Sequence, residues 1–324
     1  YLITRMLELH NRKKFKIFAF SYGINNNDKM RKRISDAVDV FYDVYDKSDK
    51  EVALLARQDR IDIAVDLNGY TNHARTNIFA YRVAPIQINF LGFPGTSGAS
   101  FIDYIIADKT LIPYKNKKYF SEKVIYLPNS YMPTDNTRAL SNKLPSRCDM
   151  GLPEDSFVFC CFNNNYKITS EEFDIWMRVL KKVEKSVLWL RSSNFSAEEN
   201  LKNEAKKRSI DPSRLIFASK VNMEEHITRH KLADLFLDTF NFNAHTTASE
   251  ALWAGLPIVT KIGKGFAARV ASSLLCAIDL PELITTTNQQ YENLVLELAT
   301  NQNKLNAINQ KLEINRLKEK LFNS

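Results

Sequence analysis

Short, nearly continuous apolar segments alternate with amphipathic helical segments along the whole chain. We predict strands at residues 15–20, 61–67, 86–91, 104–107 and 123–127, and then at 157–162, 187–190, 215–217, 235–237 and 258–259. Helices are predicted between them, for example at residues 48–57, 171–183 and 266–275. Strands that are apolar on both faces and separated by helices form parallel sheets with helices on either side. The pattern therefore predicts an α/β fold.

Two domains are expected, because the 324 residues are enough for two hydrophobic cores. Residues 133–153 are rich in Asn, Ser and Pro and form the natural linker. We predict Rossmann-like domains at residues 1–135 and 150–324, facing a central cleft, with ligands at the carboxyl ends of the strands. Residues 1–9 have helical periodicity with no strand before them, and residues 304–321 form a charged helix without a C-cap. We therefore expect an internal fragment whose first domain lacks its first strand.

Composition narrows the classes of partner. The chain is 44% hydrophobic and contains neither an apolar run long enough to span a membrane nor a signal peptide, so no membrane partner is expected. The net charge of +8 comes from dispersed groups such as residues 31–33 and 206–208, without the interleaved aromatics of a nucleic-acid surface. The four cysteines lack metal-ligand spacing, and Cys160 and Cys161 lie side by side in an apolar strand, which favours the cytoplasm.

Residues 243–257 carry the strongest local signal, a loop that enters a helix between two predicted strands. Thr247 precedes Glu250 by three residues, as in a capping box. The side chains of His245, Thr246 and Thr247 would then lie beside the free N–H groups of the first helical turn. An imidazole, two hydroxyls and free N–H groups together suit a phosphate. The alternative is an ordinary capped surface helix.

Two further segments contain basic side chains that could contact an anionic ligand. Residues 162–169 follow a strand and open a helix, so that Lys167 could neutralise a diphosphate, or be a solvated lysine in a polar turn. His226 and Arg229 lie three residues apart on one face of a predicted helix, which suits a base or ribose contact but is also common on plain surfaces. No Asp-x-Asp metal clamp stands at a strand end of the second domain, so we expect Lys167, Arg229 and helix dipoles to neutralise the diphosphate.

Two glycine-rich loops also follow strands. Residues 91–98 contain three of the nine glycines, which permit close backbone approach to a ligand or a tight turn, but they match no Walker loop. Residues 263–268 match the Gly-x-Gly-x-x-Ala dinucleotide pattern. The acidic residue expected about 20 positions further on is missing, however, so a nicotinamide-dependent enzyme remains the minor alternative.

Taken together, six segments resemble the catalytic region of the O-GlcNAc transferases, glycosyltransferase family 41, in order and approximate spacing. They are residues 68–75, 84–87, 91–98, 162–168, 224–226 and 245–247. The resemblance covers nearly the whole chain and implies the GT-B fold of two Rossmann-like domains. It also implies that Lys167 is catalytic and holds the leaving diphosphate. The implied nucleotide-sugar-binding residues are Leu91, Gly92, Asn164, Tyr166, Val221, Met223, His226, Arg229, His245, Thr246, Thr247 and Glu250.

The chain also departs from the family pattern. Met223 stands where some members have Lys, which weakens a specific uridine contact, and Asn164 stands where some have Gln. By resemblance, an Asp and a His for acceptor-side chemistry are expected a few residues ahead of Tyr1, and tetratricopeptide repeats further upstream. Without them we expect the fragment alone to bind UDP weakly and to transfer no sugar.

The resemblance implies an inverting, metal-independent glycosyltransferase that moves N-acetylglucosamine from UDP-GlcNAc to Ser or Thr of proteins. The expected partners are a UDP-sugar donor and a protein or peptide acceptor, with no cofactor and no metal. Two alternatives stay open beside the nicotinamide enzyme. One is a protein O-fucosyltransferase of the same family that uses GDP-fucose, and the other is a non-catalytic nucleotide-sugar-binding or scaffold protein.

Overall fold

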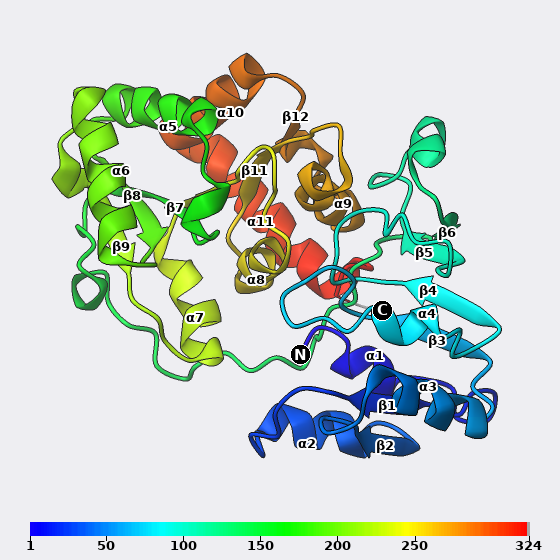
Figure 1. Cartoon of the computed structure of the whole chain (residues 1–324). Coiled ribbons are helices and arrows are strands. Elements are labelled where there is room, and N and C mark those ends of the chain that lie inside the picture. Colours follow the sequence, from blue (N-terminus) through cyan, green and yellow to red (C-terminus); the bar gives the residue numbers. More distant parts are fainter. Residues whose placement is uncertain (323–324) are drawn as a thin grey trace. The chain divides into compact units, whose positions relative to one another are not determined.

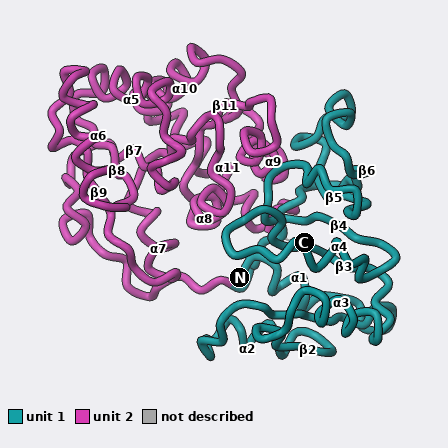
Figure 2. The backbone as a smooth tube through the Cα atoms, in the orientation of Figure 1, with its two compact units in different colours: residues 1–137, 324 teal, residues 138–323 magenta. Residues whose placement is uncertain are grey.

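The computed structural model describes residues 1–322 and divides into two compact units (Figure 2). The first comprises Tyr1–Thr137 and the second begins at Arg138. The boundary falls inside the segment predicted as a linker, of which residues 133–147 form neither helix nor strand. Within residues 1–322, no helix is long and apolar enough to cross a membrane.

The second unit contains one parallel six-stranded sheet (Figure 1). Its strands are β7 (Phe157–Cys161), β8 (Ser186–Arg191), β9 (Leu215–Ala218), β10 (Leu235–Leu237), β11 (Ile258–Lys261) and β12 (Ile284–Thr285). The spatial order is β12-β11-β10-β7-β8-β9, and every pairing is parallel. Numbered within the unit, this is the order 3-2-1-4-5-6 of a dinucleotide-binding Rossmann sheet. The chain therefore reverses direction across the sheet between β7 and β10.

Helices connect these strands. The α-helices are α5 (Ser170–Lys182), α6 (Phe195–Lys207), α7 (Met223–Arg229), α8 (Thr246–Ala254), α9 (Val270–Ala277), α10 (Asn288–Thr300) and α11 (Gln302–Lys318). Short 3-10 helices are η2 (Cys148–Met150), η3 (Asn165–Lys167), η4 (Pro212–Arg214), η5 (His230–Leu232), η6 (Phe266–Ala268) and η7 (Pro281–Leu283). Helix α5 packs against α10, while α8 packs against α7, α9 and α11, so the two groups cover the two faces of the sheet (Figure 1).

The strands of the second unit form where the sequence is apolar on both faces. Val158, Phe159 and Cys160 in β7 and Leu188 and Trp189 in β8 are fully buried, as expected for central strands of a covered sheet. Burying these side chains is the main favourable term in folding of this unit. This buried core therefore holds the ends of the strands, and the loops that follow them, in fixed positions.

The first unit contains two separate parallel sheets. Its strands are β1 (Phe18–Ser21), β2 (Val40–Asp43), β3 (Ile63–Asp66), β4 (Ile86–Asn89), β5 (Tyr104–Ala107) and β6 (Lys123–Tyr126), and its helices are α1 (Thr4–Glu8), α2 (Lys29–Asp36), α3 (Asp49–Gln58), α4 (Asn77–Ala80) and the 3-10 helix η1 (Tyr114–Tyr119). Strand β1 pairs with β2, and β3 to β6 pair in sequence order. Within the described part of the chain, no strand pairs with the second edge of β1 or of β3.

Helix α3 joins these two sheets into one core. It begins after Ser48, whose side chain and Glu51 form a reciprocal capping box. Its apolar face, Val52, Ala53 and Ala56, is buried in a cluster that also contacts residues near both sheets: Phe20, Tyr42, Ile61 and Ala64. The helix predicted at residues 48–57 is thus confirmed, shifted by one residue.

Several boundaries differ from the prediction. Strands β2 and β12 were not predicted, because each is a short apolar stretch with polar neighbours. The helix predicted over residues 266–275 is instead η6 followed by α9, which ends at Ala277. The α/β fold class itself is confirmed in both units.

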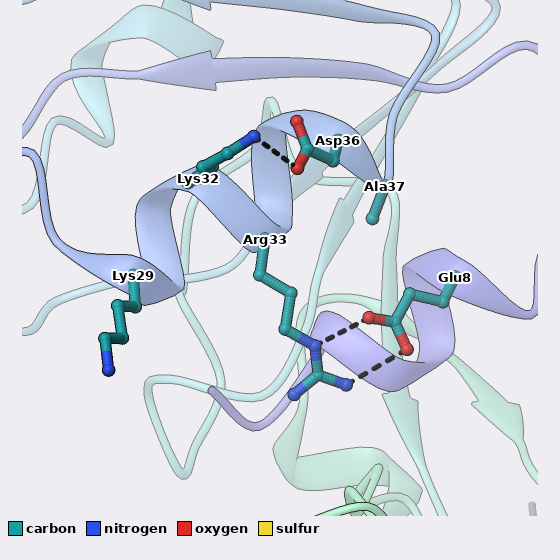
Figure 3. Close-up of a pocket in the computed structure, with 6 residues that line it drawn as sticks. All are labelled: Glu8, Lys29, Lys32, Arg33, Asp36 and Ala37. Atoms are coloured by element: carbon teal, nitrogen blue, oxygen red, sulfur yellow. Dashed lines mark hydrogen bonds and ion pairs between the residues drawn. The ribbon is translucent and has the colours of Figure 1, made fainter.

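A charged hollow lies between α1 and α2 in the first unit (Figure 3). Its lining residues are Glu8, Lys29, Lys32, Arg33, Asp36 and Ala37. Arg33 donates to both carboxylate oxygens of Glu8, at 2.6 and 3.0 Å, and Lys32 pairs with Asp36 at 2.8 Å. Arg33 also donates to Asp135 at 2.6 Å, so its guanidinium pairs with two carboxylates. The side chains that line this hollow therefore form ion pairs, and the pair between Arg33 and Glu8 connects α2 to α1.

Candidate active site

The candidate site lies where the second sheet reverses its strand order. Residues 162–169 follow β7 and residues 238–245 follow β10, and these two strands are neighbours. In open parallel sheets, ligands bind at the carboxyl ends of the strands at this topological switch point. We refer to residues 238–245, which lead from β10 to α8, as the β10–α8 loop.

Lys167 ends the short helix η3 after β7 and reaches across to the β10–α8 loop. Its Nζ donates to the carbonyl oxygen of Asn243 at 3.1 Å and lies 4.0 Å from the ring centroid of Phe242. It forms no ion pair with a carboxylate of residues 1–322, and two of its three N–H groups remain for a ligand. Burial lowers its pKa to about 8, although the charge of Asp238 opposes that shift.

Asp238 follows β10 and is fully buried. Its carboxylate accepts from the Thr260 hydroxyl at 2.6 Å and from the backbone N–H groups of Ala244 at 2.6 Å and Thr239 at 2.9 Å. Burial raises its pKa to about 7, while these bonds and the charge of Lys167 favour the ionised form. Sequence reasoning did not single out Asp238, although an acidic residue directly after an apolar strand, here the one predicted at residues 235–237, is a recognisable signal.

Helix α8 begins at Thr246 with His245 as its N-cap. The capping box predicted for Thr247 and Glu250 is therefore wrong. The Thr247 hydroxyl donates instead to Oδ1 of Asn163 at 2.6 Å, so a partner from another loop takes it. Thr246 has a half-buried hydroxyl without a hydrogen bond to any described residue, and the first N–H groups of the helix have no intrahelical acceptor.

His245 is held beside Lys167 in a neutral state. Its ring stacks on Phe242 at 4.6 Å between centroids, and its Nε2 lies 3.1 Å from the carbonyl oxygen of Ala267. Because a carbonyl only accepts, Nε2 carries the proton and Nδ1 has the lone pair. Burial first and the neighbouring Lys167 second lower the pKa of His245 to about 3.

A second group of site residues extends from α7 to α8. Nη2 of Arg229 donates to Nδ1 of His226 at 2.7 Å, so Nε2 of His226 bears the proton and faces Glu250 at 3.5 Å. Arg229 is only 4% exposed, bonds the carbonyl oxygen of Ser219 at 2.6 Å and lies over the ring of Phe162 at 4.7 Å. The structure brings His226 and Arg229 together as predicted, but the buried guanidinium of Arg229 does not join Lys167.

The remaining predicted residues of the second unit surround these two groups. Oδ1 of Asn164 accepts from Arg191 at the end of β8, and its Nδ2 donates to the hydroxyl of Tyr166 at 3.2 Å. Tyr166 is 78% exposed. Val221 is half-buried just before α7, and Met223, in the first turn of that helix, is exposed. Arg191 was missed by sequence reasoning because it ends a strand without a recognisable motif.

Leu91 and Gly92 lie in the first unit, in the loop after β4. Leu91 has a φ of +79°, and a Cβ on Gly92 would come within 2.3 Å of the carbonyl oxygen of Leu67. The second position therefore requires glycine for the close approach of two backbone segments. Their predicted place beside the donor sugar stays a prediction.

The Gly-x-Gly-x-x-Ala loop of residues 263–268 packs on the β10–α8 loop. The Gly263 N–H donates to the carbonyl oxygen of Ala268 at 2.7 Å, and a Cβ at Gly263 would lie 2.5 Å from that of Ala268. The Ala267 carbonyl oxygen accepts from the Asn243 N–H at 2.9 Å. Its glycine thus serves internal packing, and a 3-10 helix follows it, so the nicotinamide alternative is not favoured.

An ammonium, an unpaired hydroxyl and the first turn of a helix therefore meet at the switch point of a Rossmann sheet. Such groups suit an anionic phosphate ester. Among the residues that the structure describes, no cluster of His, Cys, Asp or Glu side chains is arranged to hold a metal ion.

The fold is that of a GT-B glycosyltransferase. The O-GlcNAc transferase of Thermobaculum terrenum, solved as a lysine-to-methionine mutant, superposes with a TM-score of 0.92 at 28% identity, over 100% of this chain and 61% of that one. The Anabaena protein HepE, solved in complex with UDP, shares the fold at 12% identity and a TM-score of 0.58, over 94% and 88% of the two chains. The model of glycosyl transferase family 41 matches residues 1–145 and 136–324, so the chain belongs to that family.

Two curated relatives show how much of a longer protein is matched. The Arabidopsis thaliana protein named "Probable UDP-N-acetylglucosamine--peptide N-acetylglucosaminyltransferase SEC" is 38% identical over 330 residues, covering 100% of this chain and 34% of that protein. The UDP-N-acetylglucosamine–peptide N-acetylglucosaminyltransferase of Caenorhabditis elegans is 28% identical, over 99% of this chain and 38% of its own length. The chain thus spans about a third of the length of these relatives.

Proposed function

We propose that this chain is part of a glycosyltransferase that moves N-acetylglucosamine from UDP-GlcNAc to Ser or Thr hydroxyls of proteins. The names of the relatives from Arabidopsis and Caenorhabditis support this donor and this acceptor. The observation that carries the proposal is the ammonium of Lys167, which lies without a carboxylate partner beside the start of α8. A nucleotide diphosphate supplies the negative charge that this arrangement lacks.

In the proposed reaction, the acceptor hydroxyl oxygen bonds to C1 of the sugar as the C1–O bond to the diphosphate breaks, and the proton of that hydroxyl is released to water. The bonding electrons leave with UDP, so negative charge grows on the terminal phosphate. Lys167 and the first turn of α8 would stabilise that charge by donating hydrogen bonds. Because these donors neutralise the leaving group, the proposal needs no metal ion. Attack on the face opposite the diphosphate inverts the configuration at C1.

The nucleoside is proposed to lie on the side of α7. Glu250 and His226 would contact the ribose, with Val221 and Met223 beside the base. Arg229 is buried beneath His226 and would fix its ring rather than touch the donor. Asn164 and Tyr166 would border the diphosphate, because they precede Lys167 directly. We also propose a cytoplasmic location, because Cys160 and Cys161 lie buried in β7, a place for reduced thiols.

The donor can be tested by calorimetric titration with UDP, GDP and NADH. We expect UDP to bind and GDP to bind about tenfold more weakly. A preference for GDP would favour fucosyl transfer, and binding of NADH alone would overturn the glycosyltransferase proposal.

Transfer can be tested with the natural full-length protein. We expect UDP-GlcNAc to add one N-acetylhexosamine to an acceptor peptide, read by intact mass, with equal rates in the presence of EDTA. Loss of activity in EDTA that Mn²⁺ restores would contradict the metal-independent mechanism. Binding of UDP without transfer would support the non-catalytic alternative.

A further inference from the structure

Asp238 connects more of the candidate site than any single predicted residue. Its carboxylate accepts bonds from both ends of the β10–α8 loop, through the N–H groups of Thr239 and Ala244, and from Thr260 on β11. A carboxylate has several acceptor positions, so one group can close a loop and bind it to the next strand. An uncharged apolar side chain in this place would leave these buried donors unpaired, which is costly.

Further bonds carry that order to the first turn of α8. The Asn243 side chain donates to the carbonyl oxygen of Thr239 at 2.7 Å, and the Thr239 hydroxyl donates to that of Phe242 at 2.6 Å. Asn163, after β7, donates to the Thr239 hydroxyl at 2.8 Å and accepts from Thr247. The loop, the end of β7 and the helix therefore form one connected network around Asp238.

Lys167 depends on the same loop for its position. Its two close contacts, the carbonyl oxygen of Asn243 and the ring of Phe242, both belong to the segment closed by Asp238. Its ammonium is half-buried, and the charge of Asp238 acts on it across the loop. The position and the charge of the proposed catalytic residue thus both rest on Asp238.

We propose that Asp238 is a positioning residue of the donor site, whose carboxylate shapes the β10–α8 loop and keeps Lys167 protonated for the diphosphate. The proposal rests on the proposed function, because it assigns Lys167 to the leaving group. Asp238 is buried and does not touch the donor. It acts through Lys167 and through the first turn of α8.

The other titratable groups around Asp238 do not supply this charge. Cys161 on β7 and Tyr291 on α10, whose hydroxyl donates to the Asp238 carbonyl oxygen at 3.3 Å, both have pKa values raised by burial and stay neutral. The Glu172 carboxylate on α5 accepts from the N–H and the hydroxyl of Thr169, and the charge of Asp238 is the largest of those that raise the pKa of Lys167. Lys167 is therefore the cation that responds to Asp238.

The test is Asp238→Asn, which keeps the shape of the side chain and removes its charge. We expect the pKa of Lys167, followed by NMR of ¹³C-methylated lysines, to fall by about one unit. A fall from about 8 to about 7 lowers the protonated fraction at pH 8.5 roughly eightfold and leaves it almost unchanged at pH 6. UDP affinity should therefore fall about eightfold at pH 8.5 and less than about twofold at pH 6.

Thr239→Val is the matched control, because it removes the hydroxyl bonds of the same loop to Phe242 and Asn163 and leaves the bonds to the Asp238 carboxylate in place. We expect its UDP affinity to keep the pH dependence of the unmodified chain. If Asp238 only supports the fold, both variants will lose affinity equally at every pH, with lower melting temperatures. That result, or an unchanged pKa of Lys167 in Asp238→Asn, would overturn the proposal. Failure of the unmodified chain to bind UDP would instead overturn the proposed function.

Discussion

Replacement of Lys167 by methionine separates a catalytic lysine from a structural one. Methionine fills a similar volume and removes the ammonium that donates to Asn243. If that ammonium stabilises the leaving diphosphate, its loss should lower kcat/KM by about 10²–10³, or about 2.7–4 kcal/mol, as for loss of one donor to a developing oxyanion. The assay is peptide glycosylation by the full-length protein under subsaturating UDP-GlcNAc.

The pH dependence of kcat/KM provides a second test of the role of Lys167. With a pKa of about 8, Lys167 is roughly 90% protonated at pH 7 and roughly 10% at pH 9. The profile of kcat/KM, which reports groups of the free enzyme, should therefore fall about tenfold across this range. The Lys167→Met variant should lack this fall. A fall that persists in the variant would have another source.

Stability should change in the opposite direction from activity. The pKa of Lys167 in the folded chain lies below its ordinary value, so the folded state disfavours the charged lysine. This penalty is present below pH 8 and fades as the pH rises from about 8 toward 10.5. Methionine removes it, so the variant should melt at a higher temperature than the unmodified protein at pH 7.

Lys264→Met provides the control, because Lys264 is an exposed lysine on the neighbouring glycine loop. We expect it to leave kcat/KM and the melting temperature unchanged. The reasoning is refuted if Lys167→Met keeps kcat/KM within about threefold of the parent, or if it loses activity together with thermal stability.

Two further predictions concern other parts of the chain. Thr246→Ala should weaken UDP binding about fivefold with no change in melting temperature. Thr247→Ala should lower both the UDP affinity and the melting temperature, because only the Thr247 hydroxyl bonds Asn163. Calorimetry and thermal melts compare the two variants, and identical melting temperatures would disprove the distinction. Gly92→Ala should destabilise the first unit by about 2 kcal/mol or more in urea unfolding, because the added Cβ would lie 2.3 Å from a backbone oxygen. Gly23→Ala is the control and should leave the stability unchanged, because there is open space around Gly23. Equal midpoints for the two glycine variants would refute the packing argument.

The sequence was most informative where local chemistry decides the structure. The apolar strands of the second unit are continuous enough to be located from sequence alone, and their alternation with helices predicts the parallel sheet. Lys167 could be singled out because it lies in the short polar segment between such a strand and the next helix. The short strands β2 and β12 lack that continuity, so nothing local distinguishes them from loops.

Tertiary partners decided what the sequence could not predict. The capping-box pattern at Thr247 and Glu250 satisfies a local rule, yet Asn163 and His226, from distant segments, bind these two side chains. The connecting role of Asp238 depends on Thr260, 22 residues further along the chain. Local sequence does not show which remote donor will reach a buried acceptor, so these contacts become visible only in the folded chain.

The unpaired edges of β1 and β3 have a consequence for handling the protein. A strand edge with free N–H and C=O groups can accept any extended segment that meets it, including one from a second copy. Beside the edge of β3, Ile63 and Val65 are 49% and 41% exposed, so such an addition would also remove apolar surface from water. We expect residues 1–324 produced alone to self-associate as concentration rises, visible by sedimentation velocity, and Val65→Lys to suppress that association while leaving UDP affinity unchanged.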